Sequence, residues 1–230
     1  MKSQLLKFVP VLILIIALLV PQEVFSQTKP IRVGLRGGWN YAFTNVEVAY
    51  GQVKGRQGLN IGGVFEYWIS DMFAIHTNVL YNMKGNKWEE EIGYGYGTNE
   101  YKWEFNYLSI PLLAKFAFGS QVKFYVVIGP EFSFLLSGKE VKEGEGWELY
   151  NETTGERDLK DYMNSFEFAG VLRLGVDIQV DPVVIFIDVG GSVGLTDIFK
   201  ETPPGLIMEE GSVINLVPSA SVGVLYQLGD

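Results

Sequence analysis

Alternation of apolar and polar residues is the feature that most constrains this chain, because a period of two places successive side chains on opposite faces of a β-strand. In residues 31–43 the odd positions carry large apolar side chains such as Leu35 and Trp39, whereas the even positions carry Arg32, Arg36 and small or polar residues. Helical periodicity is scarcely visible beyond the N-terminus. The same alternation recurs in eight segments, which we expect to be strands: 31–43, 59–69, 72–84, 101–116, 122–136, 166–179, 183–196 and 214–228.

The connections between these segments fall into two kinds. Those after the second, fourth and sixth segments are tight, whereas those after the first, third, fifth and seventh are long and polar. Short turns at one end and long loops at the other are typical of outer-membrane barrels, and strands of ~9 to 11 residues suffice to cross a bilayer. An open sheet edge in lipid would leave backbone groups unpaired. The sequence therefore predicts an all-β fold: an eight-stranded antiparallel up-and-down transmembrane β-barrel with short periplasmic turns and long extracellular loops.

The N-terminus has the pattern of a secretory signal peptide. Lys2 and Lys7 precede an apolar stretch over residues 8–20, and Ser26 stands before the expected cleavage point. That stretch is shorter than the ~20 residues that a membrane-spanning helix needs. We therefore expect residues 1–26 to be a cleaved signal peptide and residues 27–230 to form one outer-membrane β-barrel domain, exported to the outer membrane.

Composition excludes several classes of protein. The chain has no Cys, which rules out disulfides, thiolate metal sites, Cys nucleophiles and a lipoprotein's acylated cysteine. Its formal net charge is -9, so a nucleic-acid partner is not expected, because affinity for phosphates comes from clustered Lys and Arg. The expected partners are outer-membrane lipid and a protein that binds the extracellular loops.

The polar parity of the strands is expected to face the barrel interior. An eight-stranded barrel is just wide enough to be filled by side chains, so opposite charges inside it should pair rather than line a pore. Glycines on the same parity leave room for the larger side chains. The predicted inward charged residues are Arg32, Arg36, Glu66, His76, Lys84, Lys115, Lys123, Glu131, Glu167, Arg173, Asp177 and Asp188.

Aromatic residues near the strand ends predict the two interfacial girdles of a membrane barrel. Most of them share the parity of the apolar face, which favours girdles over a soluble barrel's core. The candidates are Trp39, Tyr41, Tyr67, Trp68, Tyr81, Trp103, Tyr107, Tyr125 and Tyr226.

Catalytic and metal-binding patterns are weak. His76 is the only histidine, so a His-dependent triad has one candidate base, with Ser133 or Ser192 as conceivable nucleophiles. Their spacing does not place them together, and a structural His76 is favoured. No EF-hand spacing and no glycine-rich loop followed by a helix is present. We expect no catalytic, cofactor-binding or metal-ligating residue and no cofactor.

The long connections are the more plausible functional surface, because a rigid barrel leaves its loops free to vary. Residues 137–164 are rich in glutamate and aspartate, and Glu89–Glu91 and Glu209–Glu210 add to the acidity. A solvated acidic surface is favoured over a calcium site.

One run resembles a known family. Residues 107–116, Tyr-Leu-Ser-Ile-Pro-Leu-Leu-Ala-Lys-Phe, are similar to the "YLEIPLLLK" strand of the PorT-type outer-membrane β-barrel proteins of Bacteroidota, with Ser109 in place of the usual acid. Residues 33–40, 129–136 and 221–226 also fit that family. The resemblance implies an integral outer-membrane protein without a transferable catalytic residue. The family's founding member is linked to protein secretion, and a secretion link is kept as a hypothesis.

Three functions follow as alternatives. The first is a non-enzymatic outer-membrane barrel with a side-chain-filled lumen, whose acidic loops serve as an envelope or partner-binding platform. The second is an exported soluble ligand-binding barrel, in which the apolar parity would point inward and the charged parity outward. The third is an outer-membrane enzyme acting on lipid.

Overall fold

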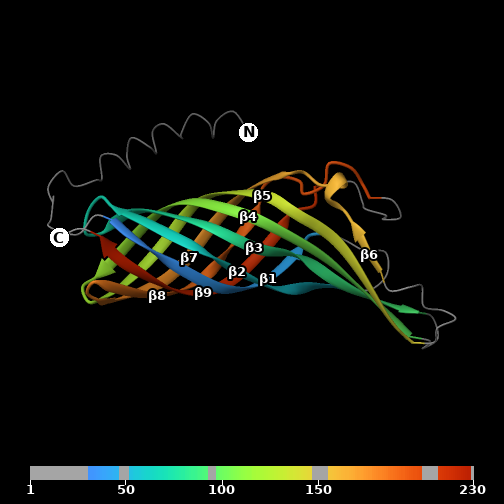
Figure 1. Ribbon diagram of the computed structural model, residues 1–230, viewed down its shortest axis with the longest axis horizontal. Helices are drawn as coiled ribbons and strands as arrows, with labels where there is room; N and C mark the ends of the chain where they lie inside the picture. The colour runs from blue at the N-terminus through green and yellow to red at the C-terminus, as the bar shows by residue number, and fades with distance from the viewer. Residues whose placement is uncertain (1–30, 47–51, 93–96, 147–154, 204–211, 229–230) are drawn as a thin grey trace, which may run out of the picture.

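The computed structural model describes residues 31–46, 52–92, 97–146, 155–203 and 212–228, and Figure 1 shows them as one barrel with a sheet that projects from one end. The expected signal peptide, residues 1–26, lies outside the described residues. The strands are β1 (Ile31–Thr44), β2 (Gln52–Trp68), β3 (Phe73–Ile92), β4 (Gly97–Gly119), β5 (Val122–Gly146), β6 (Gly155–Asp158), β7 (Phe166–Val180), β8 (Val183–Gly194) and β9 (Asn215–Leu228).

Eight of these strands close into a ring of antiparallel neighbours. The sheet order is β4-β3-β2-β1-β9-β8-β7-β5-β6, and the additional pairing of β4 with β5 closes it. Every ring strand pairs with the next ring strand in sequence, and β1 pairs with β9 from Ile31↔Leu228 to Thr44↔Asn215. The predicted all-β, eight-stranded up-and-down barrel is confirmed, and β6 is a short ninth strand outside the ring.

Tight turns join the strands at the periplasmic end. Gly119 ends β4 with a φ of 120°, a left-handed conformation in which a Cβ would lie 2.2 Å from the carbonyl oxygen of Val122. Asp181 and Pro182, joined by a cis peptide bond, turn β7 into β8. At the Ile69–Met72 turn, the Ser70 hydroxyl accepts a hydrogen bond from the Phe73 N–H at 3.1 Å. The sequence predicts tight connections after its second, fourth and sixth segments, and these three turns are at those positions.

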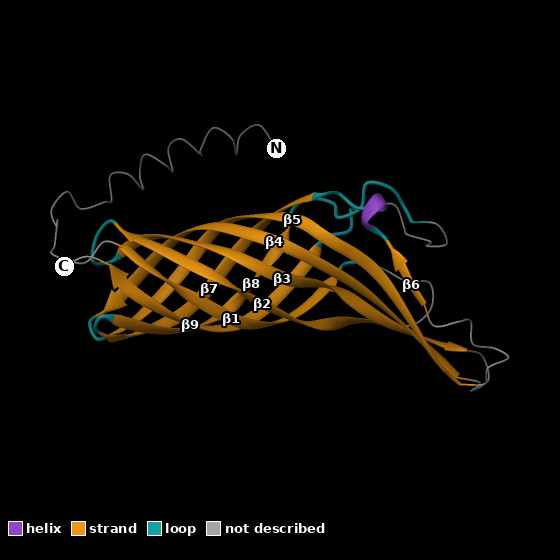
Figure 2. Ribbon diagram, viewed as in Figure 1, coloured by secondary structure: helices purple, strands orange, loops and turns teal. Residues whose placement is uncertain are grey.

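The extracellular ends of β2, β3, β4 and β5 extend further than predicted. β3 and β4 remain paired out to Ile92↔Gly97, and β4 and β5 out to Gly97↔Gly146. Figure 2 shows these strands leaving the barrel as a projecting sheet, which we call the outer sheet (residues 52–55, 84–92, 97–106 and 137–146). Residues 137–146, expected to be loop, are therefore strand. This segment consists of charged and small residues apart from Val141, so the criterion of one apolar face did not detect it.

The described parts of the β5–β7 and β8–β9 connections, residues 155–165, 195–203 and 212–214, lie at the extracellular end of the barrel. β6 pairs with β5 from Lys139↔Asp158 to Lys142↔Gly155, and a short 3-10 turn follows at Lys160–Tyr162. The two connections are joined by a bridge between Met163 and Phe199. In the described part of the chain, no helix has the length and apolar character needed to cross a bilayer.

The two faces of the barrel wall differ as the parity of the sequence predicts. The outer face carries exposed large apolar side chains, such as Leu35 at 71% and Ile61 at 62% of their full exposure. Two apolar clusters lie inside. The first is in the barrel wall: Val64, Trp68, Ala74, Leu113, Ala117, Tyr125, Val127, Val171, Val184, Phe186 and Leu225. The second, here the outer apolar cluster, lies at the extracellular end: Trp88, Trp103, Phe105, Tyr107, Leu135, Leu159, Met163, Ile198, Phe199 and Val213.

Candidate functional site

The barrel interior gathers all twelve charged or titratable residues that the alternation assigns to it. Each is at most 8% exposed: Arg32, Arg36, Glu66, His76, Lys84, Lys115, Lys123, Glu131, Glu167, Arg173, Asp177 and Asp188. The exported soluble barrel required the opposite parity, with the charged residues outside. The structure contradicts that alternative, because the charged side chains are inside and the large apolar ones are outside.

At the periplasmic third of the barrel, Lys115 joins two carboxylates. Its Nζ lies 2.7 Å from Glu66 Oε1 and 2.7 Å from Asp177 Oδ2. Arg32 stands beside the same two acids, with its NH1 3.7 Å from Glu66 and 3.8 Å from Asp177. The Trp68 ring packs against the Arg32 guanidinium, whose carbon is 4.5 Å from the ring centroid. Residues from β1, β2, β4 and β7 thus meet in one network.

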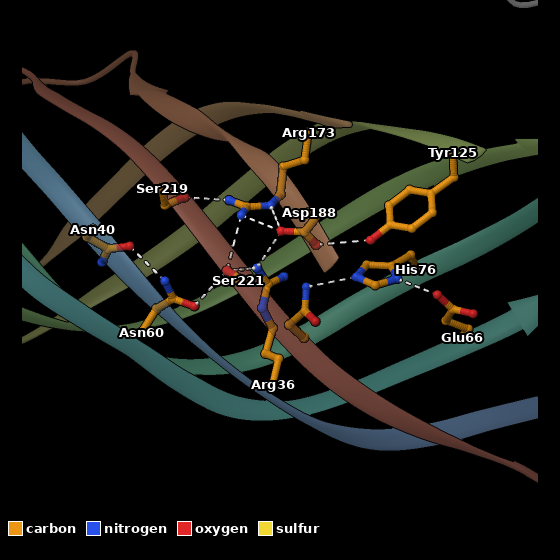
Figure 3. A network of polar contacts seen from close by, with 11 residues as sticks. Arg36, Asn40, Asn60, Glu66, His76, Tyr125, Arg173, Asp188, Ser219 and Ser221 are labelled. Atoms are coloured by element: carbon orange, nitrogen blue, oxygen red, sulfur yellow. Dashed lines mark hydrogen bonds and ion pairs between the residues drawn. The ribbon is translucent and has the colours of Figure 1, made fainter. Parts of the chain in front are cut away.

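His76 belongs to this network. Its Nδ1 lies 2.9 Å from Glu66 Oε1, and its Nε2 lies 3.2 Å from the amide nitrogen of Asn78. Figure 3 shows the ring beside Glu66. Glu66 and His76 face each other because β2 and β3 pair them directly in register. Both ring nitrogens of His76 therefore have a polar partner inside the barrel wall.

At mid-height, Asp188 collects donors from three other strands. The Arg173 Nε donates to its Oδ1 at 2.8 Å, and the Arg36 NH2 donates to the same atom at 3.3 Å. The Tyr125 hydroxyl donates to its Oδ2 at 3.1 Å. Ser221 accepts from Arg36 at 2.6 Å, which completes the group seen in Figure 3. This satisfies the rule that a buried charge needs both a partner and hydrogen bonds.

Nearest the extracellular end, Lys84 is the central cation. Its Nζ donates to Glu167 at 2.9 Å, to Glu131 at 3.1 Å and to Ser133 at 3.4 Å, and its side chain is fully buried. Asn215 donates to the other oxygen of Glu167 at 2.6 Å. β3, β5, β7 and β9 are therefore joined by one lysine and its two carboxylates.

The space between these networks is small. A cavity of ≈ 30 Å³ lies among Arg36, Asn82, Glu131 and Arg173 and their neighbours, which is room for about one water molecule. Asn40 donates to Asn82 at 2.6 Å and accepts from Asn60 at 2.7 Å beside it. Side chains and their hydrogen bonds occupy the interior at this level.

The serines considered as nucleophiles do not assemble with His76. Ser133 bonds Ser109 at 2.7 Å and Glu131 at 3.1 Å. The register places Ser133 level with Leu80 through Ser109, four residues from His76 along β3, or about 13 Å. Ser192 lies in β8, paired with Val171 and Val217. Within the described ranges, no group of three or more His, Asp and Glu side chains is placed to hold a metal ion.

The girdle prediction is wrong for four aromatic residues. Trp68, Trp103, Tyr107 and Tyr125 are at most 6% exposed and lie inside the barrel or in the outer apolar cluster. They stand on the polar parity, and lysine or arginine heads pack on three of them, Trp68, Tyr107 and Tyr125; Lys115 lies 4.0 Å from the Tyr125 centroid. Their position on the polar parity of the strands was the sequence signal that could have distinguished them from the girdle residues. The other five face outward at 39% exposure or more: Trp39, Tyr41, Tyr67, Tyr81 and Tyr226.

The acidic segments form cross-strand ion pairs in the outer sheet instead of a free acidic loop. Lys102 contacts Glu100 and Glu143, each at 2.9 Å, and Lys87 contacts Glu100 at 3.0 Å. Hydrogen bonds to Glu143 and Glu100 raise the pKa of Lys102. Burial alone would raise the pKa of Glu100, but the hydrogen bonds from Lys102 and Lys87 outweigh it and lower that pKa. Glu209 and Glu210 lie outside the described residues.

Further pairs extend this pattern across the outer sheet. Lys139 contacts Glu156 at 2.7 Å and Arg157 contacts Glu140 at 3.0 Å, so β6 is held to β5 by charges as well as by backbone bonds. Much of the acidity that the sequence places here is therefore balanced by lysine or arginine on a neighbouring strand.

Comparison with known proteins gives a family and a set of distant structural relatives. Residues 25–200 match the family model of the outer membrane protein beta-barrel domain. A search of curated proteins finds no match. Ail, the attachment invasion locus protein of Yersinia pestis, is 11% identical with a TM-score of 0.42, over 85% of this chain and 98% of that one. OprG from Pseudomonas aeruginosa is 10% identical with a TM-score of 0.43, over 90% and 100%. Neisserial surface protein A is 14% identical with a TM-score of 0.41, over 86% and 97%.

Proposed function

Because the chain belongs to the outer membrane protein beta-barrel domain family, we propose that it is a non-enzymatic barrel that does not conduct and that presents its outer sheet as a binding platform at the cell surface. The observation that carries this proposal is a set of three buried ion-pair networks at successive heights in the barrel, centred on Lys115, Asp188 and Lys84. Paired side chains of this kind fill the interior of an eight-stranded barrel, which supports a barrel without a water-filled pore.

The outer apolar cluster supports the same proposal. Trp103 and Phe105 on β4 pack against Phe199 of the β8–β9 connection, with ring centroids 5.2 and 6.1 Å apart. The Leu159 N–H donates to the Gly138 carbonyl at 2.8 Å, which holds the β5–β7 connection to the outer sheet. A lid of this kind would close the extracellular end above the charged interior.

The burial of His76 and Ser133 favours a non-enzymatic role over an enzyme acting on lipid. Both side chains lie inside the wall, at 2% and 0% exposure, where membrane lipid does not reach. Export through a cleaved signal peptide over residues 1–26 and membership of the PorT-type branch with a secretion link are part of the proposal. They rest on the sequence patterns at the N-terminus and in residues 107–116.

Two measurements test the two halves of this proposal. In planar bilayers the reconstituted protein should give no stable conductance steps, and steps as large as those of an open barrel would contradict a closed interior.

The binding platform is tested by photo-crosslinking in cells. The crosslinking residue is placed at Glu143, which is exposed on the outer sheet, and, as the matched control, at Leu172, which is 53% exposed to lipid. A protein adduct of one defined mass from position 143 alone is expected. Absence of any adduct at 143, or the same adduct at both positions, would contradict it.

A further inference from the structure

Three lysines stand side by side across the outer sheet. Lys54 on β2 pairs in register with Lys87 on β3, which pairs with Lys102 on β4. All three point away from the outer apolar cluster, because their neighbours Trp88 and Trp103 are the buried residues of the alternation. We call this set the lysine row. Like charges directly opposite one another destabilise a sheet, so a row of this kind needs a compensating partner.

The partner within the chain is a row of glutamates one step further from the membrane. Glu89, Glu100 and Glu143 are also in register with each other. Lys54 contacts Glu89 at 2.7 Å, and both side chains are about two-fifths exposed, at 43% and 39%. Ion pairs in water at such sites contribute only ~0 to 1 kcal/mol, so an incoming anion can compete for the lysines.

The lysine row borders a groove of ≈ 430 Å³ on the side away from the glutamate row. Its lining contains four cations, Lys54, Arg56, Lys87 and Lys102, but only one carboxylate, that of Glu104; the remaining lining residues are Tyr41, Gly55 and Gln57. The Arg56 NH1 donates to the Lys84 carbonyl at 2.7 Å, and its NH2 lies 3.3 Å from Glu104, so the guanidinium is fixed at the groove wall. The lining of the groove therefore holds more cations than carboxylates, although each of the four cations also has a carboxylate within 2.7 to 3.3 Å.

The groove lies immediately beyond the lipid-facing band. Tyr41 lines it, and Trp39, whose ring centroid is 5.9 Å from that of Tyr41, is the next outward residue of β1 on the membrane side. On β2, Leu59 is 58% exposed to lipid, and Arg56 follows three residues further out, about 10 Å along the strand. With strands tilted by ~45°, this height corresponds to the headgroup layer of the bilayer. A ligand reaching the groove from the membrane meets the Arg56–Glu104 pair first, then the lysine row, and the glutamate row last.

From this placement we propose that the groove binds the phosphate-bearing headgroup of a lipid in the outer leaflet, with Lys54, Arg56, Lys87 and Lys102 as its ligands. Lysine and arginine are the side chains that bind phosphate by charge-assisted hydrogen bonds. The aromatic pair Trp39 and Tyr41 provides the adjoining surface for the lipid's glycerol or sugar region and upper acyl chains. The glutamate row holds the lysines in position when the groove is empty.

The test compares one triple variant with a conservative one. Lys54→Gln/Lys87→Gln/Lys102→Gln and Lys54→Arg/Lys87→Arg/Lys102→Arg are purified in detergent, and heat-modifiable gel mobility verifies that each is folded. Dioctanoyl phosphatidic acid is titrated against the micellar protein, with dioctanoyl phosphatidylcholine as the matched neutral lipid. The glutamine variant should bind phosphatidic acid at least about tenfold more weakly than wild type, because it loses charged hydrogen bonds. The arginine variant should retain binding, and phosphatidylcholine should bind none of the proteins tightly.

A second variant changes the affinity in the opposite direction. Glu89→Gln/Glu100→Gln/Glu143→Gln removes the competing carboxylates and should bind phosphatidic acid more tightly than wild type. Inorganic phosphate distinguishes the source of the anion: it should bind at least about tenfold more weakly than phosphatidic acid, because it lacks the contacts with the aromatic surface. Equal affinity for inorganic phosphate would overturn a lipid site in favour of free phosphate. Unchanged phosphatidic acid binding in the folded glutamine variant would overturn the site altogether.

Discussion

Arg173 on β7 donates from its Nε to Asp188 on β8 at 2.8 Å inside the barrel. The residues before and after Arg173 in β7 face outward, toward lipid. The two residues lie on neighbouring strands but are not directly paired, since Arg173 is opposite Gly190 and Asp188 is opposite Gly175. Glycine at both partner positions leaves the space through which the two side chains reach each other. A Cβ on Gly190 would lie 2.6 Å from the Arg173 Cα.

Replacing Asp188 with asparagine should destabilise the barrel strongly. The change leaves Arg36 and Arg173 buried without their shared counter-ion, and breaking a buried pair on one side costs ~3 to 5 kcal/mol. Urea unfolding of the protein in lipid vesicles, followed by tryptophan fluorescence, measures the difference. Glu156→Gln is the matched control, because the Lys139–Glu156 pair is exposed at 48% and 61% and should change the free energy of unfolding by at most ~1 kcal/mol. Equal effects for the two variants would contradict the role given to Asp188.

The barrel could be predicted from the sequence because two environments act on alternate residues. Leu35 faces lipid and Arg36 faces the interior, so each residue type reports its side directly. The same reasoning fails for Trp103 and Tyr107, which are apolar enough for a girdle but stand on the interior parity. It also fails for the outer sheet, because one face of that sheet contacts water instead of lipid. The outward-facing positions of β4 there carry charged residues, Lys102 and Glu104, whereas outward-facing positions within the membrane carry apolar residues. The meeting of Glu66, His76, Lys115 and Asp177 depends on the registers of several strands, which alternation alone does not give.

Phe199→Ala should loosen the connections over the extracellular end while leaving the barrel intact. Phe199 is 6% exposed and packs against Trp103 and Phe105, and removing a buried phenylalanine costs ~3 to 5 kcal/mol of packing. Trypsin should then cut faster at Lys160 in the β5–β7 connection and at Lys200 in the β8–β9 connection. Phe166→Ala, at a lipid-facing position with 41% exposure, is the control and should not change the cleavage rate. Cleavage that stays as slow as in wild type would show that Phe199 does not hold these connections.

The outer sheet should respond to pH at both extremes. The pKa of Glu100 is lowered, so its contribution to stability is complete above its unfolded value of about 4.5 and is lost as pH falls through the folded pKa. The pKa of Lys102 is raised, so its contribution is complete below about 10.5 and is lost as pH rises through the folded pKa. Amide hydrogen exchange in β3 and β4, corrected for the intrinsic effect of pH, should be slowest between these limits.

Glu100→Gln should remove most of the acid-side change in that exchange, since the group that titrates is gone. The effect is expected to be a few tenths of a kcal/mol, because these ion pairs are partly exposed to water. If the exchange rate of the variant still changes at low pH as much as that of wild type, the titrating group is another carboxylate.

His76→Ala should act on stability alone. The change removes the hydrogen bonds to Glu66 and Asn78 and leaves space in the wall, with an expected loss of ~2 kcal/mol in urea unfolding. His76→Gln, which keeps an amide donor toward Glu66, should lose less. The lipid composition of cells carrying either variant should equal that of wild type. A changed lipid profile in both folded variants would instead support an enzyme that uses His76.

The most direct test of the account is the parity of the wall itself. The chain has no Cys, so single cysteines can be placed at successive positions over residues 31–43 and spin-labelled one at a time in lipid vesicles. Accessibility to dissolved oxygen, which concentrates in lipid, should alternate with a period of two, high at Leu35, Gly37 and Trp39 and low at Arg36 and Asn40. A water-soluble nickel reagent should reach none of these positions in the middle of the strand. The reverse parity, or high accessibility to the nickel reagent at Arg36 and Asn40, would contradict a membrane barrel with its charges inside.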